Sequence, residues 1–470
     1  MNLTSYLAGK KIEATPTLEI RCPYDGRLTG TVTTAGPEHV EAAIQAALVP
    51  GEPLTRFQRA EVLDKTRRLL EERREEFARL ITGESGLCLR ETRYEVGRVS
   101  DVLRLSAAEA LRDDGQIFSG DISPQGKARK IFTFREPLSL VAAITPFNHP
   151  LNQVAHKVAP AIAAGAPVIL KPASKVPLCA VRFVELLYEA GLPGRLLSVL
   201  VGSPANVADP LVRDPRVELV TFTGGETVGK HIAATAGYKR LVLELGGNDP
   251  LIVLDDADLN LAVYLAAEGS FRNSGQRCTA VKRILVEEGI VERFTERFLD
   301  KAKEYPGGDP FDDDTRVGTV IDEAAAIELE QRVKKAVAQG AKVLLGGTRQ
   351  GALLAPTVIG DVPRDAEVVV KESFGPLAPI VPVRNLDDAI AYANSTAYGL
   401  SSGVVTTDLN RALECVRRLR TGAVNINEVP GYRVENSPFG GIKDSGLGIK
   451  EGVIEAIKSM TTVKTFSLPW

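Results

Sequence analysis

The sequence predicts an α/β protein built on two doubly wound parallel sheets, with a small additional β arm. Three observations support this fold class. Short apolar runs alternate with helical patterns over residues 138–247, a second alternating series follows over 248–424, and a polar hairpin at 117–137 precedes both. Apolar strands that alternate with helices are typical of a parallel sheet covered by helices. The length of 470 residues suggests two or three domains, at ~150 residues each.

The individual elements follow from the spacing of apolar residues and from the turn residues between them. Residues 1–35 are expected to form short strands and turns. The predicted helices cover residues 37–48, 55–83, 91–111, 151–164, 178–190 and 257–267. The predicted strands cover residues 117–118, 130–134, 141–144, 167–170, 196–201, 217–222, 241–244, 251–254, 281–286 and 461–466. Asp256 or Asn260 is expected to cap the helix that begins near residue 257, because such side chains accept hydrogen bonds from the first N–H groups of a helix.

Composition excludes several classes of protein. The net charge of −3 argues against nucleic acid or an anionic membrane as the main partner. The five cysteines form no C-x-x-C pair and the four histidines form no cluster with ligand spacing, so neither a disulfide framework nor a metal site is expected. Free cysteines indicate a reducing, cytoplasmic environment. The sequence contains neither a signal-peptide pattern nor a run of ~20 apolar residues that would predict a membrane helix.

One thiol, Cys278, lies in the stretch Gly-Gln-Arg-Cys-Thr-Ala, between a predicted helix and a predicted strand. Gly275 allows the backbone to turn there, and loops held by rigid elements often carry catalytic groups. A cysteine nucleophile needs help to ionise at neutral pH. Arg277 is expected to favour the thiolate because it places a positive charge beside the thiol. The alternative is that Cys278 is simply a small buried apolar residue.

A second stretch, Leu-Glu-Leu-Gly-Gly-Asn-Asp-Pro at residues 243–250, precedes the thiol by about thirty residues. A glutamate in an E-L-G-G run, followed by a cysteine in a G-Q-x-C run, resembles the signature pair of the aldehyde dehydrogenase superfamily. The resemblance spans about residues 20–465 and implies an aldehyde dehydrogenase-like fold. It implies that Cys278 is the nucleophile, that Glu244 is the general base and that the Asn148 amide stabilises the oxyanion. A non-catalytic binding protein on the same fold is the alternative, and the presence of all three residues argues against it.

The resemblance also implies a binding site for NAD or NADP. Lys171 corresponds to a lysine that binds the adenosine ribose, and Gly225 and Gly229 bracket a helix start that can face the pyrophosphate. Glu372 and Phe374 correspond to the pair that holds the nicotinamide ribose and ring. The implied cofactor residues are Ile144, Thr145, Pro146, Phe147, Lys171, Ala173, Ser174, Gly225, Gly229, Leu245, Gly246, Glu372 and Phe374.

Ser174 bears on the choice between the two cofactors. Many NAD-preferring members of the superfamily have a glutamate at this position, which binds ribose hydroxyls and repels a 2′-phosphate. Serine removes that repulsion, and Lys175 could attract the phosphate. We therefore expect NADP to be accepted as well as NAD.

Four basic or polar side chains occupy positions that can reach the substrate tunnel in this superfamily: Arg98, His149, Arg277 and Arg433. Guanidinium groups match carboxylate and phosphate-like oxygens, so they indicate an aldehyde with an anionic tail. In this respect the chain resembles the phosphonoacetaldehyde dehydrogenases, which implies oxidation of phosphonoacetaldehyde to phosphonoacetate through a cysteine thiohemiacetal and thioester. A structural salt bridge is the alternative for each arginine. Glyceraldehyde 3-phosphate, lactaldehyde and succinate semialdehyde are the alternative substrates.

The resemblance implies three parts. Residues 1–116 and 138–247 are expected to form a dinucleotide-binding domain, residues 248–448 a catalytic domain, and residues 117–137 and 449–470 an oligomerisation arm. Exposed strand edges tend to pair with other strands. A homodimer or homotetramer is therefore expected.

Overall fold

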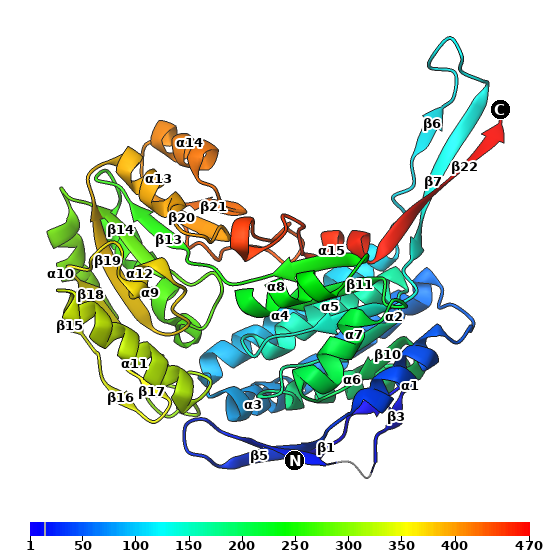
Figure 1. The fold of residues 1–470 in the computed structure, drawn as a ribbon, viewed down its shortest axis with the longest axis horizontal. Helices are drawn as coiled ribbons and strands as arrows, with labels where there is room; N and C mark the ends of the chain where they lie inside the picture. Colours follow the sequence, from blue (N-terminus) through cyan, green and yellow to red (C-terminus); the bar gives the residue numbers. More distant parts are fainter. Residues whose placement is uncertain (14–15) are drawn as a thin grey trace.

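The computed structural model describes residues 1–13 and 16–470, and the larger of its two halves is built on a seven-stranded sheet (Figure 1). In order across the sheet, the strands are β12 (Arg240–Glu244), β11 (Leu219–Thr223), β8 (Val141–Ile144), β9 (Val168–Lys171), β10 (Leu197–Val199), β2 (Tyr6–Leu7) and β3 (Lys10–Lys11). The first five pair in parallel, and β2 and β3 add antiparallel pairs at one edge. The chain order reverses between β8 and β11. Ligands bind at such a switch point, outside the carboxyl ends of the strands.

Helices cover both faces of this sheet, because alternate residues of its strands enter two different apolar cores. Val141 and Ala143 of β8 pack in one core with residues of α2 to α6, whereas Ala142 and Ile144 pack in the other with residues of α1, α7 and α8. The helices are α1 (Pro37–Leu48), α2 (Arg56–Glu72), α3 (Arg74–Ser85), α4 (Leu89–Ala110), α5 (Pro150–Ala164), α6 (Leu178–Glu189), α7 (Asp209–Arg213) and α8 (Glu226–Thr235). This layered arrangement confirms the predicted doubly wound fold.

The single helix predicted over residues 55–83 is wrong, because the chain breaks into α2 and α3 at Arg73. Arg73 has φ −109° and ψ 21°, outside the helical range. Its guanidinium donates two hydrogen bonds of 2.7 Å to Glu189 at the end of α6. The break lets both segments bury their apolar faces, with Leu70 before it and Phe77 after it fully buried. A tertiary contact therefore decides a boundary that the apolar spacing did not mark.

The second half contains another seven-stranded sheet, in which all pairs are parallel except the one at the β15 edge. In order, its strands are β15 (Lys342–Leu345), β18 (Thr357–Gly360), β19 (Leu377–Val383), β14 (Arg283–Glu287), β13 (Pro250–Val253), β20 (Ser401–Val405) and β21 (Ala423–Ile426). Its helices are α9 (Leu259–Phe271), α10 (Val291–Ala302), α11 (Glu323–Ala338), α12 (Glu367–Val370), α13 (Leu386–Asn394) and α14 (Leu409–Arg418).

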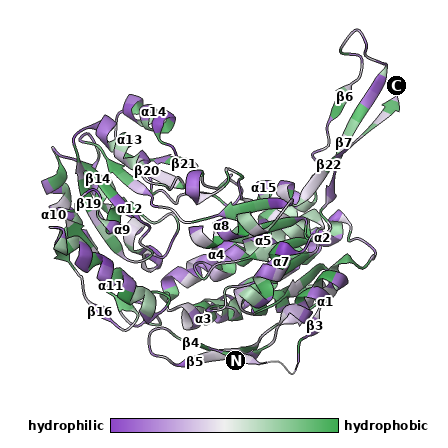
Figure 2. Cartoon of the chain, viewed as in Figure 1, coloured by the Kyte–Doolittle hydropathy of each residue, from purple (hydrophilic) through white to green (hydrophobic). Residues whose placement is uncertain are grey.

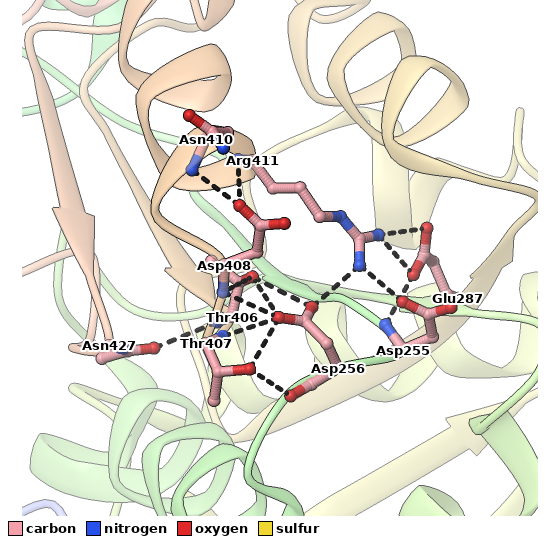
Figure 3. A network of polar contacts seen from close by, with 9 residues as sticks. All are labelled: Asp255, Asp256, Glu287, Thr406, Thr407, Asp408, Asn410, Arg411 and Asn427. Carbon is pink, nitrogen blue, oxygen red and sulfur yellow. Dashed lines mark hydrogen bonds and ion pairs between the residues drawn. The ribbon is translucent and has the colours of Figure 1, made fainter.

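The carboxyl ends of β13, β14 and β20 are closed by a network of charged side chains (Figure 3). Arg411 of α14 donates to Asp256 at 2.8 Å and to both carboxylate oxygens of Glu287 at 2.8 Å. Asp256 also accepts hydrogen bonds from the Thr406 and Thr407 hydroxyls. The edge of the second sheet where a ligand crevice is ordinarily found is thus filled by the chain's own groups.

The predicted cap of α9 is wrong, since the first N–H groups of this helix are bound by Asp258. The Asp258 carboxylate accepts from Asn260 N–H at 2.8 Å and from Leu261 N–H at 3.3 Å. Asp256 is committed to the network around Arg411 instead. Asn260 lies within the first turn and not before it.

A three-stranded antiparallel arm projects from the body of the molecule (Figure 1). It is formed by β6 (Ile117–Ser119), β7 (Arg129–Pro137) and β22 (Thr461–Pro469), with β22 paired along the whole of β7. Apolar residues occur along these strands as well as inside the body (Figure 2). Helix α15 (Val453–Ser459), which the prediction assigned to the arm, packs against α4 and α5.

Two small sheets complete the chain. One contains β1 (Asn2–Leu3), β5 (Leu28–Thr33) and β4 (Thr17–Arg21), and the other contains β16 (Arg349–Gln350) and β17 (Leu353–Leu354). Across residues 1–13 and 16–470, none of the helices has both the length and the apolar character needed to cross a membrane.

Candidate active site

Three consecutive residues with left-handed backbone conformation lead into Cys278. Asn273, Ser274 and Gly275 have φ values of 56°, 54° and 68°. A side chain at Gly275 would bring its Cβ to 2.1 Å from the carbonyl oxygen of Gly375, so only glycine fits there. Left-handed residues other than glycine cost about 1–3 kcal/mol each and cluster at functional sites. The loop before the thiol is therefore strained, and the surrounding structure must hold it.

Side-chain hydrogen bonds hold this loop against residues 318–321. The Ser274 hydroxyl donates to the Gly318 carbonyl at 3.0 Å. The Gln276 side-chain oxygen accepts from the Ile321 N–H at 2.8 Å. The glutamine of the G-Q-x-C run thus anchors the loop, and the position of the thiol is fixed by the packed segment beside it.

Burial raises the pKa of the Cys278 thiol to about 11. Lys282 and Arg433 lower this pKa because their positive charges favour the thiolate, whereas Asp249 and Glu372 raise it. The thiol is therefore protonated at neutral pH in this state, and nucleophilic attack requires removal of its proton.

The Arg277 guanidinium is bound to backbone carbonyl oxygens and not to the thiol beside it in sequence. It turns away and donates to the carbonyl oxygens of Glu268 at 2.9 Å and Gly269 at 2.6 Å, in the last turns of α9. A buried guanidinium needs acceptors, and the end of a helix offers carbonyls without helical partners. Lys282 is the first cation among the causes that lower the pKa of Cys278. The charge of Cys278 also raises the pKa of Arg277, but after the charges of Glu91 and Glu268.

Glu244 ends β12 as a buried carboxylate. Within the described part of the chain, neither of its side-chain oxygens has a hydrogen-bond partner. Burial, followed by the negative charge of Glu451, raises the pKa of Glu244 well above its usual value, and nearby cations including Lys157 oppose the shift. Lys157 itself is fully buried and donates to Glu451 at 2.5 Å. A side chain at Gly440 would come within 2.6 Å of the Glu244 carboxylate, so the glycine-rich loop at residues 438–448 leaves room for it.

Asn148 is buried in the turn that follows β8, and His149 begins α5 with φ 50°. Glu95 of α4 fixes this turn, because its carboxylate accepts from the N–H groups of Leu151 at 2.8 Å and Asn152 at 3.0 Å. The other Glu95 oxygen lies 3.7 Å from His149 Nδ1. Burial lowers the pKa of His149, so this side chain is neutral at neutral pH and contributes hydrogen bonding rather than charge.

Arg98 is already paired within the protein. Its guanidinium donates to both oxygens of Glu435, at 2.6 and 3.2 Å, and His156 Nε2 lies 2.6 Å from the same carboxylate. Although burial raises the pKa of Glu435, His156 and Arg98 hold it well below its usual range. The Arg98 guanidinium is therefore occupied by Glu435, which lies in the same loop as Arg433.

Arg433 is in a different situation. It stacks over the ring of Phe439 at 4.0 Å, and it forms no hydrogen bond or ion pair with any of residues 1–13 and 16–470. Its positive charge lowers the pKa of Cys278, and burial lowers the pKa of Arg433 itself. Of the four predicted substrate residues, this is the guanidinium left available for an anion.

Lys171 is buried at the end of β9, and this burial lowers its pKa to about 8. Its ammonium group donates to the Ser174 hydroxyl at 3.3 Å, and Ser174 donates to the Gly202 carbonyl at 2.8 Å. Two of the three ammonium protons therefore remain for a ligand. Lys175 is exposed and paired with Asp322, which caps α11 in the other half of the chain.

The switch point of the first sheet has the features of a dinucleotide site. The hydroxyls of Thr145 and Thr223, at the ends of β8 and β11, are buried without partners among the described residues. Gly225 precedes α8 and has nothing within 4 Å of the position of a Cβ, whereas Gly229 packs against Leu245. Orphaned hydroxyls beside an open helix N-terminus fit a pyrophosphate. The other predicted cofactor residues follow the same strands: Ile144, Pro146 and Phe147 at β8, Ala173 at β9, and Leu245 and Gly246 at β12.

Glu372 connects the predicted nicotinamide residues with the E-L-G-G run and with the thiol loop. Its carboxylate accepts from Gly247 N–H of the E-L-G-G run at 3.0 Å and lies 3.3 Å from Lys282 Nζ, next to the thiol loop. Phe374, two residues on, packs edge-to-face on Phe147 with ring centroids 5.6 Å apart. The predicted nicotinamide residues and the predicted catalytic residues therefore belong to one connected site.

Asp249 lies in the stretch at residues 243–250, where only Glu244, Leu245 and Gly246 were predicted as site residues. Three further charged residues of this site have no motif that marks them in the sequence: Glu95, Lys282 and Glu435. Lys282 comes only four residues after the thiol, and that proximity was the one available signal. The others become visible only through their contacts.

Comparisons with known proteins give consistent results over nearly the whole chain. The model of the aldehyde dehydrogenase family matches residues 11–466. The 3-sulfolactaldehyde dehydrogenase of Priestia megaterium is 39% identical over 457 residues, which cover 97% of this chain and 96% of that protein. The sulfoacetaldehyde dehydrogenase of Neptuniibacter caesariensis is 40% identical over 410 residues, 87% of this chain and 89% of that protein. The crystal structure of the NADP-dependent glyceraldehyde-3-phosphate dehydrogenase from Bacillus halodurans, complexed with NADP, superposes with a TM-score of 0.95 at 35% identity and covers 100% of this chain and 99% of that chain.

Proposed function

Because this chain belongs to the aldehyde dehydrogenase family, we propose that it oxidises a short anionic aldehyde to the carboxylate through a covalent intermediate on Cys278. Family membership confirms the aldehyde dehydrogenase-like fold, the class of NAD(P)-dependent oxidoreductase and the cofactor NAD or NADP that the sequence predicts. The identity of the aldehyde and the roles of individual residues are proposals.

The first half of the reaction belongs to Cys278 and Asn148. The thiol gives its proton to a water molecule, its sulfur attacks the aldehyde carbon, and the carbonyl oxygen becomes an oxyanion in a thiohemiacetal. Asn148 donates its side-chain N–H to that oxyanion, together with the backbone N–H of Cys278. Lys171, Glu372 and Phe374 would hold NAD or NADP, which when bound would supply the hydride acceptor.

The second half belongs to Glu244. Loss of hydride leaves a thioester on Cys278, and a water molecule must be activated to hydrolyse it. Glu244 takes the proton from this water as its oxygen attacks the acyl carbon, and the thiolate leaves. A buried carboxylate with a raised pKa and no internal hydrogen bonds is suited to this step.

One observation supports an anionic substrate: the guanidinium of Arg433 lies near enough to the thiol to affect its pKa and has no ion-pair partner among the described residues. An aldehyde short enough to reach Cys278 would place its tail near this group, with the neutral His149 as a further hydrogen-bonding group. The named substrates of the relatives include aldehydes with sulfonate and phosphate groups, which are also tetrahedral oxyanions. We propose phosphonoacetaldehyde, whose phosphonate presents the same oxygen geometry to a guanidinium fork.

The test is the formation of reduced cofactor by the purified protein with phosphonoacetaldehyde, sulfoacetaldehyde, glyceraldehyde 3-phosphate, lactaldehyde, succinate semialdehyde or propanal. The proposal expects the largest kcat/KM with phosphonoacetaldehyde. Preference for another anionic aldehyde would correct the substrate and keep the site. Equal, slow turnover of propanal and all anionic aldehydes would remove the anion site.

Arg433→Ala should lower kcat/KM for the preferred anionic aldehyde by roughly ten- to a hundredfold, since a charge-assisted hydrogen bond contributes about 1.5–3 kcal/mol. Turnover of propanal should change much less. Arg98→Ala should also impair the anionic substrate, but through Glu435, whose carboxylate then loses a partner. Equal losses on propanal and the anionic aldehyde in Arg433→Ala would contradict an anion-binding role.

A further inference from the structure

Lys282 is a buried lysine whose ammonium group is entirely occupied at the thiol loop. Its Nζ donates to the carbonyl oxygen of Cys278 at 2.6 Å and to that of Arg277 at 2.8 Å. It also lies 3.3 Å from the Glu372 carboxylate, and its side chain is 1% exposed. An ammonium group has three protons, and three acceptors surround this one.

The charges with the largest effect on the thiol come from four residues on separate segments, and Arg277 is a fifth charged group coupled to it. Lys282 and Arg433 are positive, and Asp249 and Glu372 are negative. Asp249 accepts from Ser401 N–H at 3.2 Å through one oxygen, while its other oxygen is buried without a partner among the described residues. Burial raises the pKa of Asp249 to about 8. This carboxyl group therefore gains its charge only as the solution becomes mildly alkaline.

We propose that Lys282 is a positioning residue for the nucleophile: it fixes the backbone of Cys278 against Glu372 and supplies the positive charge that favours the thiolate. Asp249 is the opposing carboxyl group. This inference rests on the proposed role of Cys278. It assigns to Lys282 the electrostatic task that the position of Arg277 in the sequence suggested.

The geometry favours Lys282 over Arg277 for this task. The ammonium group contacts the nucleophile's own carbonyl oxygen, so its charge stays at a fixed place relative to the sulfur. The Arg277 guanidinium is directed to the Glu268 and Gly269 carbonyls. Removal of the ammonium group would also take this donor from the Cys278 carbonyl oxygen, and a carbonyl left without a partner is costly. The Arg277 carbonyl oxygen would keep the Ala280 N–H at 3.1 Å.

The rate of Cys278 alkylation by iodoacetamide tests the proposal without cofactor or substrate. The modified peptide is quantified by mass spectrometry, which separates Cys278 from the four buried cysteines. Lys282→Met should slow alkylation about tenfold near pH 8, because one unit of pKa changes the thiolate fraction tenfold well below the pKa. Lys282→Arg should retain most of the rate.

Asp249→Asn should change the alkylation rate in the opposite direction, and the asparagine oxygen can keep the hydrogen bond from Ser401 N–H. It should accelerate alkylation above about pH 8, where the wild-type carboxyl group is charged, and leave the rate unchanged well below that pH. Thermal unfolding would show whether Lys282→Met folds. If it does not fold, Asp249→Asn still tests the proposal.

Arg277→Met is the matched control, since it also removes one buried positive charge near the thiol. Its effect should be clearly smaller than that of Lys282→Met. Wild-type alkylation in Lys282→Met, an equal effect in Arg277→Met, or slower alkylation in Asp249→Asn would each overturn the inference alone. Alkylation of Cys278 that leaves propanal oxidation intact would instead remove the proposed catalytic role of the thiol, and the inference with it.

Discussion

Two buried glutamates near the site show how neighbours assign different tasks to the same side chain. Glu435 has Arg98 and His156 as partners, and its pKa is held well below the usual range. Glu244 has no hydrogen-bond partner among the described residues, and its pKa is raised. A paired carboxylate stays charged and holds structure, whereas an unpaired one can exchange a proton. This contrast favours Glu244 as the base.

Glu244→Gln should abolish the pH dependence of thioester hydrolysis. A raised pKa means that the carboxyl group is protonated at lower pH and becomes a base only as pH rises through that value, so wild-type hydrolysis should rise with pH over the same range. The glutamine variant should turn over at least ~100-fold more slowly, because general-base catalysis contributes about 10²–10⁴-fold. It should still produce a first burst of reduced cofactor.

Rapid mixing, followed by steady-state rates across the pH range, would measure both phases. An unchanged steady-state pH profile in the variant would show that another group activates the water.

At the residue scale, the sequence predicts the groups that a motif marks and misses those defined by distant contacts. Cys278 and Glu244 stand in recognisable runs, and the structure brings both into one site. Glu435 meets Arg98 across 337 positions of sequence, so no local pattern could identify it. Arg277 was misjudged because adjacency in sequence does not fix side-chain direction. Its guanidinium follows the free carbonyls of α9 instead.

At the scale of elements, the cofactor site depends on the turns that follow β8, β9 and β11. Their position at the carboxyl ends of the parallel strands follows from the sheet topology. The alternation of strands and helices predicted the sheet, and the family resemblance implied the cofactor residues. The turn after β9 contains Lys171 and Ser174, and Ser174 Oγ already donates to Gly202. Because Lys175 is paired with Asp322, the absence of a carboxylate at residue 174 becomes the main reason to expect tolerance of a 2′-phosphate.

Ser174→Glu should therefore lower kcat/KM for NADP at least ~10-fold while leaving NAD much less affected, since a carboxylate repels the phosphate and can bind ribose hydroxyls. Ser174→Ala is the control that removes the hydroxyl without adding charge. Initial rates with each cofactor measure the change. Wild-type NADP turnover below about a hundredth of NAD turnover would contradict the expected acceptance of NADP.

The errors at this scale have one physical origin. Asp256, Asp258 and Asn260 are all suitable caps, and local chemistry does not choose among them. Arg411 makes the choice, 155 residues later in the chain, by binding Asp256. Similarly, the break between α2 and α3 depends on Glu189, which is 116 residues from Arg73. Periodicity predicts that an element exists, while its ends depend on partners that fold beside it.

At the scale of the whole molecule, the arm presents apolar side chains on its two outer strands. Ile117 on β6 is 65% exposed and Leu468 on β22 is 46% exposed. Among residues 1–13 and 16–470, both strands have one edge without a neighbouring strand, and such edges pair readily. We propose that the arm joins copies of the chain into a homodimer or homotetramer.

The double variant Ile117→Lys, Leu468→Lys should dissociate the assembly, because charged side chains at strand edges oppose pairing. Sedimentation velocity should give the mass of two or four chains for the wild type and of one chain for the variant. A double variant at Lys10 and Lys11, on an edge strand away from the arm, is a suitable control. A wild-type protein that sediments as a single chain would contradict the proposal.

The pairing of Lys157 with Glu451 has a consequence for synthesis of the chain. Lys157 is fully buried in α5, and its partner comes 294 residues later. At about 5–20 residues per second, a ribosome takes on the order of 15–60 seconds to reach that partner. Until then the α5 lysine has no carboxylate and the Glu244 pocket lacks one wall. The first sheet, whose last strand ends at Glu244, can thus assemble early, whereas the second sheet gains β21 and the proposed water-activating centre gains Glu451 only when translation is almost finished.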